Sequence, residues 1–195
     1  MPQKPGPETR PEAKLADAAL RLLAKTPWQD LTLAAVARAA KLQLADLQQI
    51  APSKPRLFGL ILKRIGAAVA AQHRAGPGDI HDRMFEVALA WFGALAKHKK
   101  AVRSLYECLR RDPLSLVSAR DGILEAAHWL MALAEADRGP ALSLRALGFA
   151  AVLGHAVPAW LDDGPDLAKT MSRLDADLRH GESVMKRAPL VEDDD

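Results

Sequence analysis

The chain has 195 residues and a mass of 21.1 kDa, and 49% of its residues are hydrophobic, so it can bury a substantial core. Its single cysteine, Cys108, excludes an intramolecular disulfide and favours a reducing compartment. The net charge is +3, but residues 1–66 hold 11 Lys and Arg against 5 Asp and Glu, so basic character is concentrated in the first third. The first residues lack the apolar run of a secretory signal, which favours a cytoplasmic protein.

Apolar residues recur at helical spacing along most of the chain, and no alternating strand pattern is found. Leu15, Ala19 and Leu22 share a face of the first segment, and Pro and Gly clusters separate it from the segments that follow. The pattern predicts an all-α fold. It predicts about nine helices, over residues 10–25, 32–39, 43–50, 54–74, 79–97, 99–111, 113–135, 139–161 and 165–180.

The predicted helices divide into a smaller N-terminal and a larger C-terminal group. The stretch "AGPGD" at residues 75–79 is the best candidate hinge, and the fourth helix is expected to bridge the two groups. The charged ends of the chain predict disordered tails. The expected organisation is therefore a tail at 1–9, a helix-turn-helix module at 10–66, a helical bundle at 67–181 and an acidic tail at 182–195.

Local signals in the N-terminal module predict a helix, a tight turn and a second short helix. Thr32 stands where an N-cap belongs, directly before "LAAVARAA". A turn is expected at Lys41 and Leu42. Ser53 can cap the helix that follows, with Pro55 in its first turn, where no backbone donor is needed.

From about Leu15 to Ile65 the chain resembles the tetracycline-repressor (TetR) transcriptional regulators. The stretch "ALRLLAKTPWQDLTLAAVARAAKL" is similar to the family's first two helices, and "LADLQQIAPSKPRLF" to its recognition helix and "F-P-S-K-x-x-L" junction. The resemblance implies a homodimeric one-component regulator that binds double-stranded operator DNA and is controlled by a small apolar ligand. The sequence departs from the family at the turn, where Gly is usual, at the recognition-helix cap, where Gln43 replaces Ser or Thr, and at Gln48 and Ala51, where aromatics are usual.

Polar and basic side chains of this module are the candidate DNA contacts. Lysines would attract phosphates, and glutamines could hydrogen-bond base edges in the major groove. The alternative is that these side chains are only the polar faces of packed helices, and Asp46 on the reading face opposes tight DNA binding. The candidates are Thr32, Lys41, Gln43, Gln48, Gln49, Lys54 and Arg56.

For the C-terminal bundle the resemblance implies a ligand pocket and a dimer interface formed by the last two long helices. An ordinary apolar core is the competing interpretation of the same side chains. The pocket candidates are Phe85, Leu89, Trp91, Phe92, Tyr106, His128, Trp129 and Met131. The candidates for the dimer seam are Leu144, Leu147, Phe149, Val152, Leu153, His155, Val157, Trp160, Leu167, Met171, Leu174 and Leu178.

A second resemblance covers residues 159–178, "AWLDDGPDLAKTMSRLDADL", which are similar to a run in the lipid-binding accessory proteins of coenzyme Q biosynthesis. Those proteins share the TetR-like fold without chemistry of their own, so a lipid-binding or isoprenoid-binding accessory protein is the alternative function. The acids in this run are typical of helix caps, and three neighbouring carboxylates could also attract a hard cation, although caps are far commoner.

Nothing in the sequence predicts catalysis. The six histidines are never three or four residues apart, so no two share a helical face as a metal motif would require. Cys108 has no adjacent base, and no Gly-rich phosphate loop or nucleophile motif occurs. We therefore expect a protein that is not an enzyme and that needs no metal or cofactor.

Overall fold

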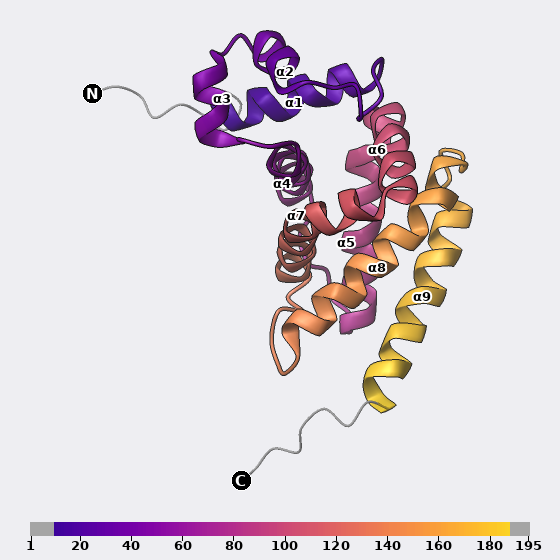
Figure 1. The fold of residues 1–195 in the computed structure, drawn as a ribbon. Helices are drawn as coiled ribbons and strands as arrows, with labels where there is room; N and C mark the ends of the chain where they lie inside the picture. The colour runs from indigo at the N-terminus through magenta and orange to yellow at the C-terminus, as the bar shows by residue number, and fades with distance from the viewer. Residues whose placement is uncertain (1–9, 188–195) are drawn as a thin grey trace. The chain divides into compact units, whose positions relative to one another are not determined.

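A computed structural model describes residues 10–187, with side chains described through Val184. Within this range the chain forms nine α-helices and one short 3-10 helix (Ala96–His98), without strands (Figure 1). The prediction of an all-α fold is confirmed. The helices are α1 (Pro11–Leu23), α2 (Leu33–Ala40), α3 (Leu44–Ile50), α4 (Lys54–Gln72), α5 (Ile80–Leu95), α6 (Lys99–Arg111), α7 (Pro113–Leu133), α8 (Leu142–Leu161) and α9 (Ala168–Arg187).

The main departure from the predicted boundaries concerns α9. This helix begins at Ala168 instead of residue 165, because Leu167 has a φ of 54°, a left-handed conformation that interrupts a right-handed helix. It continues to Arg187, so residues 182–187 are helical and the prediction of a disordered tail there is wrong. The predicted tails at 1–9 and 188–195 lie outside the described residues.

The described residues form two compact units. Unit 1 comprises residues 10–68 and 95–126, and unit 2 comprises residues 69–94 and 127–187. The first break in the chain falls close to the predicted boundary at 66/67. Unlike the predicted module, unit 1 also includes α6 and the first part of α7.

Unit 1 is built around α1, which packs against both α2 and α6. The backbone N–H of Trp28 donates to Ser104 Oγ at 2.9 Å, and the Arg64 guanidinium pairs with Asp17 at 3.0 Å. These contacts tie α1 and its following loop to α6 and α4. The fully buried side chains of this unit include Leu15, Leu20, Val36, Leu47, Leu57, Ile61 and Ile65.

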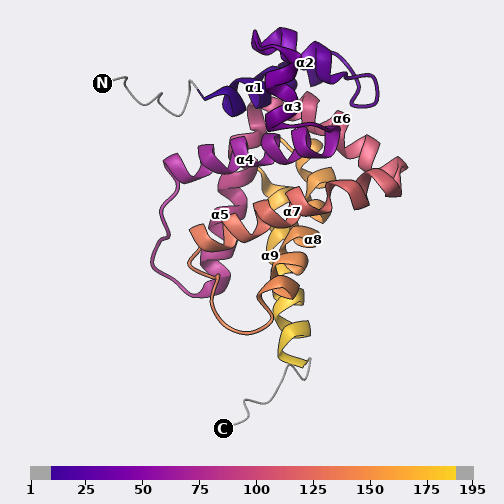
Figure 2. The same cartoon turned by 60° about the vertical axis from the view of Figure 1, so that its left-hand side comes forward.

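Unit 2 contains α5, α8 and α9, and α8 and α9 lie side by side (Figures 1 and 2). The rings of Phe92 and Trp160 pack with centroids 5.6 Å apart. Two arginines hold the chain where α7 ends: Arg83 Nε donates to the Ala134 carbonyl and Arg145 Nη2 to the Ala136 carbonyl, both at 2.9 Å. Both carbonyls follow Leu133, the last residue of α7, so these bonds hold the segment that leaves the helix.

Candidate nucleic-acid interface

The turn between α2 and α3 is well defined despite its unusual residues. Thr32 Oγ1 accepts from the Ala35 N–H at 3.1 Å, which confirms the predicted N-cap of α2. Lys41 has φ 57° and ψ 42°, the left-handed conformation in which glycine carries no steric penalty. The next N–H, of Leu42, reaches back to the Ala37 carbonyl at 3.0 Å. The tight turn therefore forms with a strained lysine in place of glycine.

The start of α3 is fixed by an acid instead of a conventional cap. Asp46 Oδ2 accepts from the Gln43 N–H at 3.1 Å, and a carboxylate in a first turn also interacts favourably with the helix dipole. Asp46, whose charge was expected to oppose DNA binding, thus positions the start of α3. Leu47 is 1% exposed and anchors α3 in unit 1, whereas Gln43, Gln48 and Gln49 are exposed.

Lys54 is half-buried and bonds to the backbone of another segment. Its Nζ donates to the carbonyls of Trp28 and Gln29, both at 2.8 Å, and lies 5.7 Å from the Trp28 ring centroid. The sequence predicted that this ammonium attracts DNA phosphates, but in the structure it is held by the loop that precedes α2. Ser53 Oγ accepts from the Arg56 N–H at 3.4 Å, which confirms the predicted cap of α4.

Three exposed cations remain on the helix-turn-helix and at the start of α4. They are Arg38, Lys41 and Arg56. Sequence reasoning missed Arg38, and the signal for it was the three-residue spacing to Lys41, which places both at the end of α2. The exposed glutamines and these cations together form the candidate interface.

The side chains predicted for the dimer seam differ in burial. Phe149, Leu153, Trp160, Leu174 and Leu178 are already buried within the chain, so the structure places them in its own core. Exposed positions are Leu144, Leu147, His155 and Met171, whereas Val152, Val157 and Leu167 are half-buried. Periodicity identified apolar helices correctly but did not distinguish the inner stripe from the outer one.

Helix α8 is long and apolar enough to cross a membrane, and it is the only such helix in the part of the chain that the structure describes. Its most apolar window has a mean hydropathy of 1.4 and is 17% buried. Gly148 and Gly154 have open space where a Cβ would stand. An apolar helix with so much uncovered surface is typical of a contact with another protein chain or with lipid.

The predicted pocket residues differ in burial, and they do not all lie in the same unit. Trp91, Phe92 and Met131 are buried, Phe85, Leu89 and His128 are half-buried, and Trp129 is 45% exposed. Tyr106 belongs to unit 1, whereas the other pocket candidates belong to unit 2.

The corner between α8 and α9 has a structural explanation. Asp163 Oδ2 accepts from both the N–H and the hydroxyl of Thr170, each at 2.8 Å, and Thr170 is fully buried. Trp160 and Leu174 are 0% exposed. The run that is similar to the coenzyme Q accessory proteins is thus occupied with packing and capping in this chain.

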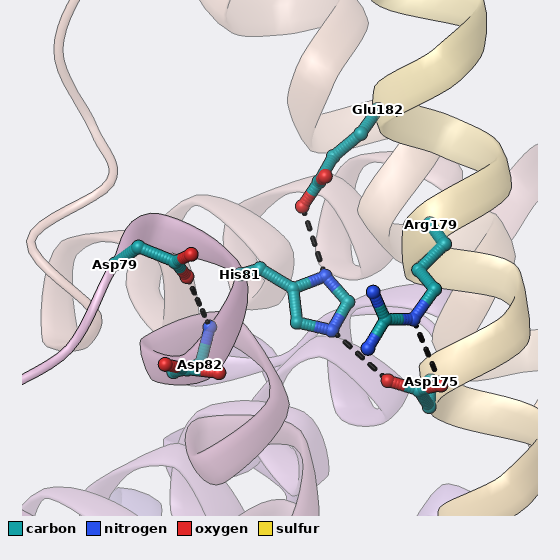
Figure 3. A network of polar contacts seen from close by, with 6 residues as sticks. All are labelled: Asp79, His81, Asp82, Asp175, Arg179 and Glu182. Atoms are coloured by element: carbon teal, nitrogen blue, oxygen red, sulfur yellow. Dashed lines mark hydrogen bonds and ion pairs between the residues drawn. The ribbon is translucent and has the colours of Figure 1, made fainter.

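A histidine connects α5 to α9 (Figure 3). His81 Nδ1 lies 2.9 Å from Glu182 Oε1, and His81 Nε2 lies 3.1 Å from Asp175 Oδ1. Ionised carboxylates only accept hydrogen bonds, so both contacts are bonds only when the imidazole is doubly protonated. The Arg179 guanidinium and then His81 lower the pKa of Asp175 through hydrogen bonds. Among the described residues no cluster of three or more potential ligands could hold a metal ion.

We expect the stability that α9 contributes to fall in acid. Hydrogen bonds from Thr170, chiefly its backbone N–H, lower the pKa of Asp163, as the bonds above do for Asp175. A carboxyl with a lowered pKa in the folded state stabilises the fold above its ordinary pKa, about 3.9, and that contribution is lost as the pH falls further. Thermal unfolding followed from neutral pH to about pH 3 should show the loss.

The matched variants are Asp163→Asn and Asp166→Asn, because Asp166 is an exposed neighbour in the same loop. Asp163→Asn should have a lower Tm at neutral pH, because the amide accepts these hydrogen bonds less strongly than the carboxylate. Its Tm should fall less in acid, because the carboxylate that titrates has been removed. Asp166→Asn should follow the wild type. Identical acid profiles for the wild type and Asp163→Asn would show that the bond to Thr170 contributes nothing.

Comparison with known proteins bears on the fold. No family model and no curated protein sequence matches the chain. Among solved structures, a TetR transcriptional regulator from Nitrosomonas europaea superposes with a TM-score of 0.63 at 15% identity, covering 88% of this chain and 98% of that one. The chain has the TetR fold.

Two further TetR-fold structures agree with this assignment. A regulator from Rhodococcus sp. RHA1 gives a TM-score of 0.57 at 15% identity and covers 91% of this chain and 98% of its own. A TetR-family regulator from Streptomyces coelicolor gives 0.54 at 18% identity and covers 89% of this chain and 81% of its own. The TetR fold thus spans nearly the whole chain, not only the segment that carries the sequence resemblance.

Proposed function

We propose that this protein is a one-component transcriptional regulator that binds duplex DNA through α3 as a homodimer and is controlled by a small apolar ligand. The observation that carries the proposal is the exposed glutamine face of α3, held by the Thr32 cap, the Lys41 turn and the Asp46 bond. Glutamine side chains can read base edges in the major groove. Exposed Arg38, Lys41 and Arg56 would supply the phosphate contacts.

The uncovered apolar surface of α8 supports the dimer. Leu144 and Leu147 are 47% and 53% exposed, and Met171 on α9 is 40% exposed. A second copy packed on these side chains would remove them from water, and two copies related by a twofold axis would present two α3 helices to one duplex. The apolar side chains of unit 2 are the proposed site of the ligand, which would act by changing the separation of the two reading helices.

The test begins with the full chain and a pool of random duplex DNA, because it requires no knowledge of the operator. We expect a selected sequence with a pseudo-palindrome, bound by a dimer in sedimentation, with an affinity that falls steeply as salt rises. Gln48→Ala and Gln49→Ala should each weaken binding to it by about tenfold to a hundredfold. Gln72→Ala, an exposed glutamine at the end of α4, is the matched control.

Lys41→Gly should have opposite effects on the stability of the fold and on DNA binding. Glycine relieves the left-handed strain, so the free energy of unfolding should rise by up to about 1 kcal/mol. Loss of one phosphate contact should reduce the salt slope of DNA binding by about one. A chain that selects no duplex but carries an isoprenoid or acyl lipid would contradict the regulator and support the lipid-binding alternative.

A further inference from the structure

The corner between α6 and α7, residues 110–120, exposes a cluster of large aliphatic side chains. Leu114 is 77% exposed, Val117 68% and Leu116 48%, all within four consecutive residues of unit 1. Leu114 and Val117 are more exposed than any other large hydrophobic side chain in the described part of the chain. Single exposed apolar residues are ordinary, but a contiguous group indicates a surface that another apolar body covers.

The backbone donors at this corner are satisfied locally. Pro113, the first residue of α7, has no N–H. The N–H of Leu114 donates to Asp112 Oδ1 at 3.0 Å, and the N–H of Leu116 donates to the Asp112 carbonyl at 3.3 Å. The first turn of a helix normally leaves such donors to water, and here the chain supplies the acceptors.

The hydroxyls of the corner are also satisfied. Ser115 Oγ donates to Asp112 Oδ2 at 2.6 Å, and Ser118 Oγ donates to the Leu114 carbonyl at 2.8 Å. The hydrogen bond from Ser115 is the largest cause that lowers the pKa of Asp112. Neutral N–H and hydroxyl groups with partners cost less to desolvate than free ones, so the apolar side chains of this turn can approach an apolar medium. The Asp112 carboxylate, whose lowered pKa keeps it charged at neutral pH, must stay at the level of water and headgroups.

Basic residues surround the aliphatic cluster. Arg110 and Arg111 form the last turn of α6, Arg120 follows in α7, and all three are exposed. Residues 110–121 hold these three arginines against two acids, Asp121 and the capping residue Asp112. The corner therefore combines protruding aliphatic groups with a positive rim.

We propose that this corner docks on an anionic lipid surface. Leu114 and Val117 would enter the boundary between headgroups and acyl chains, and the arginines would lie at the level of the lipid phosphates. This arrangement is typical of interfacial membrane binding, in which apolar burial and attraction to anionic lipid act together. A side chain that is 77% exposed protrudes from the surface, which suits insertion into a bilayer better than capture of a peptide in a groove.

The test is cosedimentation of the full chain with vesicles of phosphatidylcholine, with and without phosphatidylglycerol. The wild type should bind the vesicles that contain phosphatidylglycerol, and added salt should weaken the binding. Leu114→Ser with Val117→Ser should lower the partition by about tenfold or more, as should Arg110→Glu with Arg111→Glu. Ile80→Ser is the matched control, because Ile80 is 51% exposed at the start of α5 in unit 2.

Absence of binding to either vesicle overturns the proposal, and so does binding that the corner variants leave unchanged. If the serine variants instead alter the sedimentation of the free protein, the corner is a contact between copies of the chain, and the lipid proposal is wrong. Binding of the same variants to duplex DNA is measured in parallel by gel retardation. The corner lies outside α3, so DNA binding should be retained whether or not the vesicles bind.

Discussion

Gly122→Ala should lower the free energy of unfolding by up to about 2 kcal/mol and the Tm by up to about 8 °C for a chain of this size. A Cβ at residue 122 would stand 2.9 Å from Gly59 Cα and 3.4 Å from Gly59 N. These are backbone atoms of α4, which cannot rotate away as a side chain can. Overpacking of this kind costs about 1–3 kcal/mol, and the gain of about 1 kcal/mol from replacing glycine within a helix offsets only part of it.

Gly59→Ala is the matched control, since it adds the same methyl group to the other helix of the same contact. Its Cβ would lie 3.6 Å from Gly122 Cα, an ordinary van der Waals distance. We therefore expect Gly59→Ala to be neutral or to stabilise the protein by up to about 1 kcal/mol. Urea unfolding of both variants measures the difference. Equal effects in the two variants would mean that α4 and α7 do not approach as closely as described.

The helices could be predicted because local signals in the sequence agree with the fold. Capping residues such as Thr32 and Ser53 stand directly before amphipathic segments, and Pro and Gly mark the ends. The start of α9 could not be predicted in this way. Pro165 and Asp166 favour a helix start, but Thr170 bonds to Asp163 and Leu167 takes a left-handed φ, which together delay the helix to Ala168.

The candidate site was predictable in its residue types but not in their contacts. Gln48 and Gln49 lie on α3 and Gln43 directly precedes it, and all three are exposed. The sequence could not predict that Asp46 would cap that helix or that Lys54 would turn toward backbone carbonyls. Such contacts depend on where a separate segment of the chain lies, and helical periodicity carries no information on that.

The contact of Lys54 leads to the second large effect: Lys54→Met should cost about 1.5–3 kcal/mol of stability in the absence of DNA. Methionine keeps an unbranched apolar side chain of similar length but removes the ammonium that the carbonyls of Trp28 and Gln29 accept from, each at 2.8 Å. Both carbonyls belong to the loop between α1 and α2, so the loop should loosen. Thermal unfolding and amide exchange in residues 25–31 measure the effect.

Lys63→Met is the control, a lysine on the same helix whose partner Glu12 lies 3.3 Å away at the surface, with the two side chains 61% and 48% exposed. Exposed pairs contribute about 1 kcal/mol or less, so this variant should unfold nearly as the wild type does. If Lys54→Met binds DNA more weakly, we would then attribute the loss to a displaced loop before α2 and not to a lost phosphate contact. In that case the dependence of DNA affinity on salt should stay unchanged. A salt slope reduced by about one, with unchanged stability, would instead show that Lys54 contacts a phosphate.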